Sequence, residues 1–175
     1  AVTGFLWHNV HPARVFMGHG LLLESYLSDD KLAYYCPGDD TVGPEDELNN
    51  IDTGTQARAS YAYRHLSQTT SSYTYELGTN DAGAPAVALF MDTESYGPEA
   101  MGMYHSAHGG EQVNIAYIDG HVQREANTDA CLAIVESAFA GAPANLVPVF
   151  ERGDQVFANA DHAAIGDPAD GPTLP

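Results

Sequence analysis

The stretch HGGEQVNIAYIDGHV, residues 108–122, carries the clearest structural pattern in this chain. Its middle part alternates apolar residues with polar or small ones, which is the period of a β-strand with one buried face. The alternating apolar positions are Val113, Ile115 and Tyr117. Asp119-Gly120 then suits a two-residue turn, because such a turn requires positive φ angles. The pattern predicts a β-hairpin in which Tyr117 faces Val122 and both lie on the core face.

Weaker patterns in the rest of the chain complete an α+β prediction. Apolar residues at helical spacing predict helices over residues 18–28 and 128–140. Strands are predicted over residues 32–36, 59–66, 71–77 and 86–92, and the last of these ends at Asp92. The polar, turn-rich stretches 41–56 and 93–112 are predicted to be loops. The expected fold is a small antiparallel β-sheet with flanking short helices.

The length of 175 residues fits one main domain with an appendage. We expect the globular domain to span residues 1–141. Residues 142–175 are rich in proline, glycine and alanine, with two short apolar pieces at LVPVF and QVF. This composition predicts an extended C-terminal arm.

The charge balance is strongly acidic, with 24 Asp and Glu against 6 Lys and Arg and a net charge of -18. Nucleic acid is therefore not an expected partner, because phosphate binding needs basic side chains. No apolar run reaches transmembrane length, so we expect no membrane contact from this chain. Two interpretations of the acidity stay open: a surface kept soluble in salt-rich surroundings, or carboxylates gathered to bind calcium.

The two cysteines, Cys36 and Cys131, do not belong to a CxxC pair, so a zinc ribbon or a thioredoxin-type motif is not supported. Cysteine spacing leaves a single disulfide and two separate thiols as alternatives.

Several catalytic motifs are absent from the sequence, namely GxSxG, HExxH, the phosphate-binding loop and the full EF-hand loop. One candidate constellation remains, consisting of His105, His108, Asp119 and His121 with Asp92. Imidazoles with carboxylates could bind a transition metal or act as a general acid and base. The structural alternative is stronger, because a histidine beside Gly-Gly can bond a turn and an aspartate before glycine serves the hairpin. Asp39 and Asp40 are a second candidate, as oxygen ligands for calcium.

Four stretches occur in a recognisable order: GLLLESYLSDDKLAYYCPGDD, SYAYR, AVALFMD and HGGEQVNIAYIDGHVQ. In this order the chain resembles, over roughly residues 18–124, the prepilin-type processing-associated proteins, a group similar to type II secretion pseudopilins and type IV pilin-like proteins. The hallmark of that family is a histidine followed after about nine residues by Asp-Gly; here ten residues separate His108 from Asp119. The implied signature positions are His108, Gly109, Gly110, Asp119, Gly120 and His121, with Cys36, Pro37, Tyr61 and Tyr63 as further landmarks.

The resemblance implies a non-enzymatic, pilin-like subunit of an extracellular or periplasmic filament or secretion apparatus. Such a subunit would act by self-association or with other pilin-like subunits. The leader and long N-terminal helix that are typical of the family do not occur in these residues. The acidic composition and the oxidising compartment that the resemblance implies make a Cys36–Cys131 disulfide and a bound calcium both reasonable, and neither is required. The metal-ligand candidates are Asp39, Asp40, Asp92, His105, His108 and Asp119. The alternative from another class is a metal-dependent enzyme or ligand-binding protein that uses the cluster around His108 and Asp119.

Overall fold

The computed structural model describes residues 2–8, 15–16, 31–41, 43–53, 57–64, 78–80, 82–92, 94–101 and 103–164. Its main sheet has six strands in the order β2-β1-β3-β4-β7-β8, and every neighbouring pair is antiparallel. These strands are β1 (Val2–His8), β2 (Val15–Phe16), β3 (Ala57–Arg64), β4 (Ala88–Met91), β7 (Gln112–Tyr117) and β8 (Val122–Ala126). The predicted α+β class with a small antiparallel sheet is confirmed.

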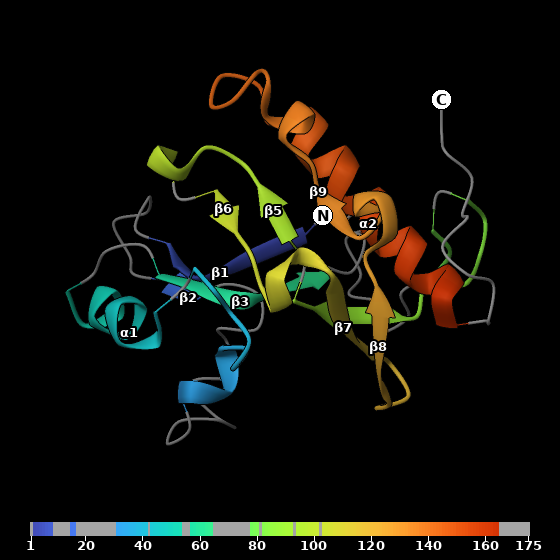
Figure 1. Ribbon diagram of the computed structural model, residues 1–175, viewed down its shortest axis with the longest axis horizontal. Helices are drawn as coiled ribbons and strands as arrows, with labels where there is room; N and C mark the ends of the chain where they lie inside the picture. The colour runs from blue at the N-terminus through green and yellow to red at the C-terminus, as the bar shows by residue number, and fades with distance from the viewer. Residues whose placement is uncertain are drawn as a thin grey trace.

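A smaller sheet of three strands has the order β6-β5-β9. Its strands are β5 (Glu94–Tyr96), β6 (Tyr104–His105) and β9 (Ala133–Ile134), and β5 pairs with β9 in parallel. Two α-helices, α1 (Pro44–Thr53) and α2 (Val147–Ala164), lie at opposite ends of the molecule in Figure 1. Short 3-10 helices are η2 (Lys31–Tyr34), η3 (Glu99–Met101), η4 (His108–Gly110), η5 (Thr128–Ala130) and η6 (Glu136–Phe139). No helix among the described residues is long and apolar enough to span a bilayer.

The hydrophobic core forms where α2 packs against one face of the main sheet. The sheet contributes Ala88, Met91, Val113, Ile115 and Tyr117, and the helix contributes Val156, Phe157 and Ala160, with Leu132 from the preceding loop. Full burial of a side chain such as Phe157 contributes about 1.5–3 kcal/mol. The alternating positions of the hairpin therefore face the core as predicted.

The hairpin turn differs from the prediction by one residue. A two-residue turn of this type needs positive φ at both central positions, but only Gly120 has it, at 89°. The loop instead has three residues, so Tyr117 bonds to His121 and Ala116 pairs with Val122. A shift of one residue moves a whole strand face. Val122 consequently leaves the core face and is 66% exposed.

Two other segments, predicted to be a loop and a strand, contain helices instead. Residues 41–56, predicted to be a loop, contain α1, which begins at Pro44 and carries three acidic residues in its first turn. Proline at the first helical position and acidic side chains near the amino end both favour a helix start. Residues 32–36, predicted to be a strand, instead begin with η2 and continue into a turn.

The predicted helix over residues 128–140 is also wrong, because that segment forms η5, β9 and η6. The extended arm predicted over residues 142–175 is wrong for residues 147–164, which form α2. Pro148 lies in the first turn, where proline is tolerated, and Gly153 is buried within the helix. Because α2 supplies core residues, residues 147–164 belong to the globular unit. The predicted helix 18–28 and strand 71–77 lie outside the described residues.

Candidate functional site

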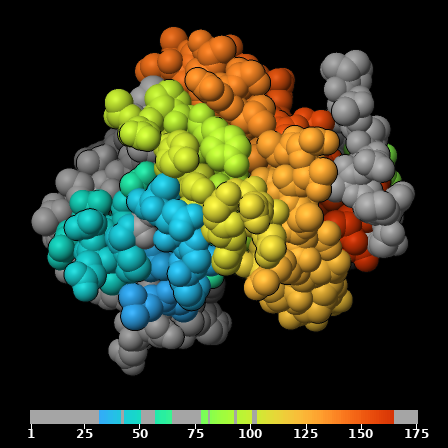
Figure 2. Space-filling view, viewed as in Figure 1, coloured from blue at the N-terminus to red at the C-terminus, as the bar shows by residue number. Residues whose placement is uncertain are grey.

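Two segments that are distant in sequence run side by side at the surface. Asp40 N–H donates to the Ser106 carbonyl and His108 N–H donates to the Gly38 carbonyl, each at 2.8 Å. Figure 2 shows these segments, light blue and yellow, in contact. The pairing brings the CPGDD stretch against HSAH, so side chains from both segments share one site.

The first cluster at this site consists of Cys36, Asp92, His108 and Asn114. Cys36 Sγ lies 3.2 Å from His108 Nε2 and donates to Asp92 Oδ2 at 3.4 Å. His108 Nε2 lies 3.0 Å from the same carboxylate oxygen. The Asn114 side chain donates to Asp92 Oδ2 at 2.7 Å, and its backbone N–H donates to Oδ1 at 2.5 Å. Residues from four segments thus meet around one carboxylate.

Burial favours the protonated form of the Cys36 thiol in this cluster. Asp92 is completely buried at the end of β4, where sequence reasoning expected a polar strand end, and Cys36 is also buried. Burial raises the pKa of the Cys36 thiol, and the Asp92 carboxylate raises it further. A thiol with a raised pKa stays protonated at neutral pH and is a poor nucleophile. The pair of Cys36 and His108 therefore does not have the electrostatics of an activated thiol.

His108 is held by backbone geometry that depends on glycine. The φ angle of His108 is 52°, and Gly109 and Gly110 follow with 66° and 77°. The imidazole lies directly over Gly38, where an added Cβ would be 2.3 Å from the ring. Oδ2 of the Asp40 carboxylate accepts a hydrogen bond from the Gly109 N–H at 3.0 Å. These contacts orient the imidazole towards Asp92.

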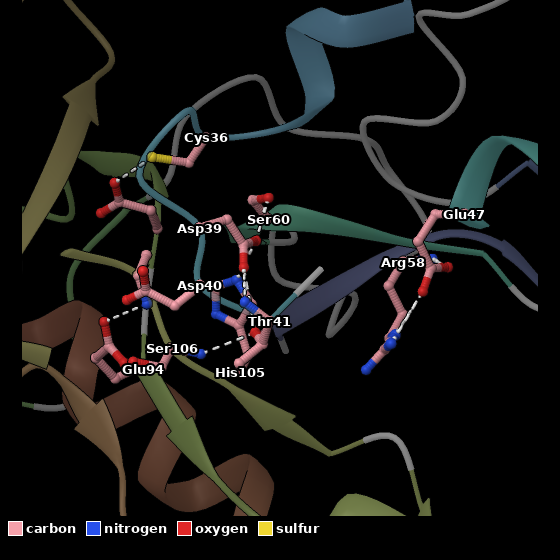
Figure 3. A network of polar contacts seen from close by, with 12 residues as sticks. Cys36, Asp39, Asp40, Thr41, Glu47, Arg58, Ser60, Glu94, His105 and Ser106 are labelled. Atoms are coloured by element: carbon pink, nitrogen blue, oxygen red, sulfur yellow. Dashed lines mark hydrogen bonds and ion pairs between the residues drawn. The ribbon is translucent and has the colours of Figure 1, made fainter. Parts of the chain in front are cut away.

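The second cluster centres on Asp39 (Figure 3). Its Oδ2 lies 2.8 Å from His105 Nε2 and accepts the Ser60 hydroxyl, while Oδ1 accepts the Thr41 N–H at 2.8 Å. Burial acts to raise the pKa of Asp39, but the hydrogen bonds from His105 and Ser60 outweigh it and hold that pKa well below 3.8. The cluster ties the loop that contains Asp39 to β3 and β6.

A third carboxylate lies buried beside these clusters. Glu94, at the start of β5, is completely buried, and its Oε1 accepts the Ala107 N–H at 2.8 Å. Burial raises the pKa of Glu94. Glu94 therefore supports the backbone next to His108.

A cleft of about 550 Å³ opens beside the first cluster. Cys36, His108 and Asn114 are its polar lining residues apart from two tyrosines. The remaining walls are Ala33, Tyr34, Pro37, Gly38, Tyr61, Phe90, Ala116 and Val122. Burial, followed by the nearby acidic groups of Cys36 and Asp92, raises the pKa of Tyr61 to about 12. The cleft is thus an apolar space with a polar edge.

The structure divides the predicted His/Asp constellation into three places. His108 and Asp92 lie in the first cluster, and His105 lies with Asp39 in the second. Asp119 instead pairs with His121 at 2.6 Å in the exposed hairpin turn. The metal-ligand set predicted from sequence is therefore not brought together as one group, and Asp119 lies outside both clusters.

The signature positions serve different purposes. Cys36, Pro37 and Tyr61 line the cleft with His108. Tyr63 instead packs on Phe90, with ring centroids 5.0 Å apart. Gly120 supplies the positive φ of the hairpin turn.

The Cys36–Cys131 disulfide expected from the resemblance is absent, because both cysteines are free thiols. The Cys36 thiol donates to Asp92, whereas Cys131 lies next to η5 and its backbone carbonyl accepts a hydrogen bond from the Asn159 side-chain amide. The two thiols thus belong to separate parts of the fold.

Sequence reasoning missed several residues of the site: Asn114, Ser60 and Glu94, and Cys36 as a partner of His108. One signal for Asn114 was present. It stands between Val113 and Ile115 in the alternating strand, so it points away from the core, towards the face that carries the cleft.

Comparison of the chain with protein-family models, with curated proteins and with solved structures gave no match.

Proposed function

We propose that this chain is a non-enzymatic, pilin-like structural subunit of an extracellular or periplasmic assembly, and that it acts by self-association. The observation that carries the proposal is the convergence of landmark positions. Cys36, Pro37, Tyr61 and His108 come from three separate segments, yet all line one cleft. Four of the ten positions named by the resemblance therefore line one cleft, whereas Tyr63 and the hairpin-turn positions lie outside it.

The contacts of this unit favour a structural role. The polar atoms of Cys36, Asp92 and His108 bond to one another, and the thiol is held in its protonated form. These bonds join the loop at residues 36–40 to the end of β4 and to η4. They stabilise the arrangement of loops and sheet without an activated nucleophile.

The hairpin supplies a surface for self-association. Among the described strands, β8 is terminal in the main sheet, and a terminal strand presents unpaired backbone groups to another chain. Val122 on β8 and Ile118 in the turn are 66% and 57% exposed. Pairing of β8 with a second copy would cover both the strand edge and these apolar side chains.

Charge sets the conditions for this association. A net charge of -18 makes two copies repel each other, and salt screens that repulsion. We therefore expect self-association to strengthen as the ionic strength rises. Sedimentation velocity at low and high salt measures this directly.

Variants at two exposed valines test the surface. Val122→Lys places a charge on the edge strand and is expected to reduce association at high salt at least tenfold. Val147→Lys is the matched control, because Val147 is 57% exposed at the start of α2 and lies away from β8. A chain that stays monomeric at all salt concentrations, or a Val122→Lys variant that associates like the wild type, contradicts the proposal.

A further inference from the structure

We infer that Cys36, Asp92 and His108 form a binding site for a transition-metal ion of the zinc type, which the neighbouring cleft makes accessible. This inference does not rest on the proposed assembly function. It concerns the same cluster but a different property, and its test is independent of self-association.

The spacing of the donor atoms fits an ion. Cys36 Sγ, His108 Nε2 and Asp92 Oδ2 lie 3.0 to 3.4 Å from one another. Zinc bonds of about 2.0–2.3 Å in tetrahedral geometry set neighbouring donors about 3.3–3.6 Å apart. An ion at the centre would therefore need outward shifts of only about 0.4 Å or less. The three atoms already converge as a ligand set must.

The donor types select the class of ion. A thiolate, an imidazole and a carboxylate together suit zinc and its neighbours among the transition metals, whereas calcium takes oxygen ligands. Only one oxygen-donor residue, Asp92, belongs to this set of three. The site therefore favours zinc, and not the calcium expected from the acidic composition. Metal binding would displace the thiol proton, which is released to solvent as the Cys36–metal bond forms.

Surrounding contacts hold the ligands in place before any ion arrives. The Asn114 backbone N–H fixes Asp92 through Oδ1, which leaves Oδ2 facing Cys36 and His108. Gly38 leaves the space that the His108 ring occupies. Such supporting contacts orient ligands in metal sites and contribute to affinity.

Asn114 completes the surroundings of the site. Its side-chain amide lies 2.7 Å from Asp92 Oδ2 and 2.9 Å from His108 Nε2. The amide nitrogen donates to Asp92 Oδ2, and this bond holds the ligand oxygen beside Cys36 and His108.

The cleft gives the ion a route of entry. Cys36 and His108 line it, whereas Asp92 is completely buried behind them. The His108 side chain is 24% exposed, so the site is open on this side. Three protein ligands with an accessible side can take up an ion from solvent.

The test uses the purified full chain, stripped with a chelator and titrated with Zn²⁺ or Co²⁺. We expect one equivalent of zinc to bind, and cobalt to give the thiolate-to-cobalt charge-transfer absorption that reports a sulfur ligand. Excess Ca²⁺ should not displace either ion. A wild-type chain that binds neither ion, or a cobalt complex without the charge-transfer band, overturns the inference.

Variants identify the ligands. Cys36→Ser should abolish the charge-transfer band, and His108→Ala and Asp92→Asn should each weaken zinc binding at least tenfold. Cys131→Ser and His121→Ala are the matched controls, because they remove the other thiol and a histidine outside the cluster. Loss of binding in the controls, with retention in the Cys36 and His108 variants, places the ion elsewhere and overturns the inference. If Cys36→Ser fails to fold, the cobalt spectrum of the wild-type chain and the zinc affinity of His108→Ala, at a partly exposed position, still decide the result.

Discussion

Asp161 and Asp92 are both completely buried aspartates, but their carboxylates are satisfied in different ways. The Asp161 carboxylate, on α2, accepts hydrogen bonds from the Arg64 guanidinium at 2.9 Å on both oxygens. It also accepts from the Asn80 amide at 3.0 Å and from two backbone N–H groups at 2.8 Å. Asp92 accepts hydrogen bonds from an amide, a backbone N–H and a thiol, and its Oδ2 lies 3.0 Å from the His108 imidazole nitrogen. One carboxylate faces a guanidinium cation, and the other faces a thiol and an imidazole, which are groups that can bind metals.

This difference separates a structural site from a candidate binding site. The donors around Asp161 are fixed, and they join α2 to β3 and β4 in the interior. Two of the groups around Asp92, Cys36 and His108, also line an open cleft. Burial of a carboxylate alone therefore says little about function, whereas the identity and accessibility of its partners are informative.

The largest effect is expected at Asp161. Asp161→Asn keeps the shape of the side chain but leaves the Arg64 guanidinium without its counter-charge, which should destabilise the fold by about 3–5 kcal/mol. Glu151→Gln, at an exposed position of the same helix, is the control for loss of one negative charge. Urea unfolding measures both, and equal losses in the two variants would show that the Arg64 pairing contributes nothing.

A smaller, pH-dependent effect is expected at Asp39. Because its pKa is lowered in the fold, its contribution is present above the ordinary value of 3.8 and is lost as pH falls below it towards the folded value. Asp39→Asn should cost about 2 kcal/mol near neutral pH, since it weakens charged hydrogen bonds. The gap between variant and wild type should shrink below pH 3.8. Unfolding curves across this range check the sign, and a constant gap would contradict it.

Gly38→Ala sharpens the comparison on the Asp92 side. The new methyl group would lie 2.3 Å from the His108 ring, so the imidazole must move, at a cost of about 1–2 kcal/mol. Zinc affinity should fall with it. Gly43→Ala is the control, because its nearest neighbour is the flexible Asp46 side chain at 3.3 Å. Identical melting temperatures and zinc affinities for the two variants would rule out this packing role.

The smallest effect is expected at Asp119, although it is a signature position. Asp119 and His121 are both exposed, so their pairing is screened by water and salt. Asp119→Ala should leave the melting temperature and zinc binding unchanged. Gly120→Ala should destabilise more, because the φ of 89° disfavours any residue with a Cβ. Loss of zinc binding in Asp119→Ala would return Asp119 to the metal site.

The fold was predictable wherever a local period decided the structure. The alternation of Val113, Ile115 and Tyr117 identified the buried face of β7. The register of Val122 was not predictable to one residue, because it depends on the turn conformation. Helix α2 was missed because Pro148 and Gly153 suggest a break, whereas packing against the sheet stabilises the helix.

The candidate site was predictable by residue type but not by partnership. His108, Asp92, His105 and Asp39 were all identified from their chemistry. Their division into two clusters follows from the pairing of residues 38–40 with residues 106–108, which no local pattern encodes. The same pairing brings Cys36 to His108, so the sulfur ligand could not be assigned from spacing.

By itself the sequence determined the acidic charge, the antiparallel hairpin and the residue types available for metal binding, because these depend on composition and on the period of a single strand. Only the tertiary structure decided that Cys36, Asp92 and His108 meet beside a cleft while Asp119 stays in an exposed turn. The physical reason is that contacts between distant segments depend on loop closure and on packing of the whole core, to which every segment contributes.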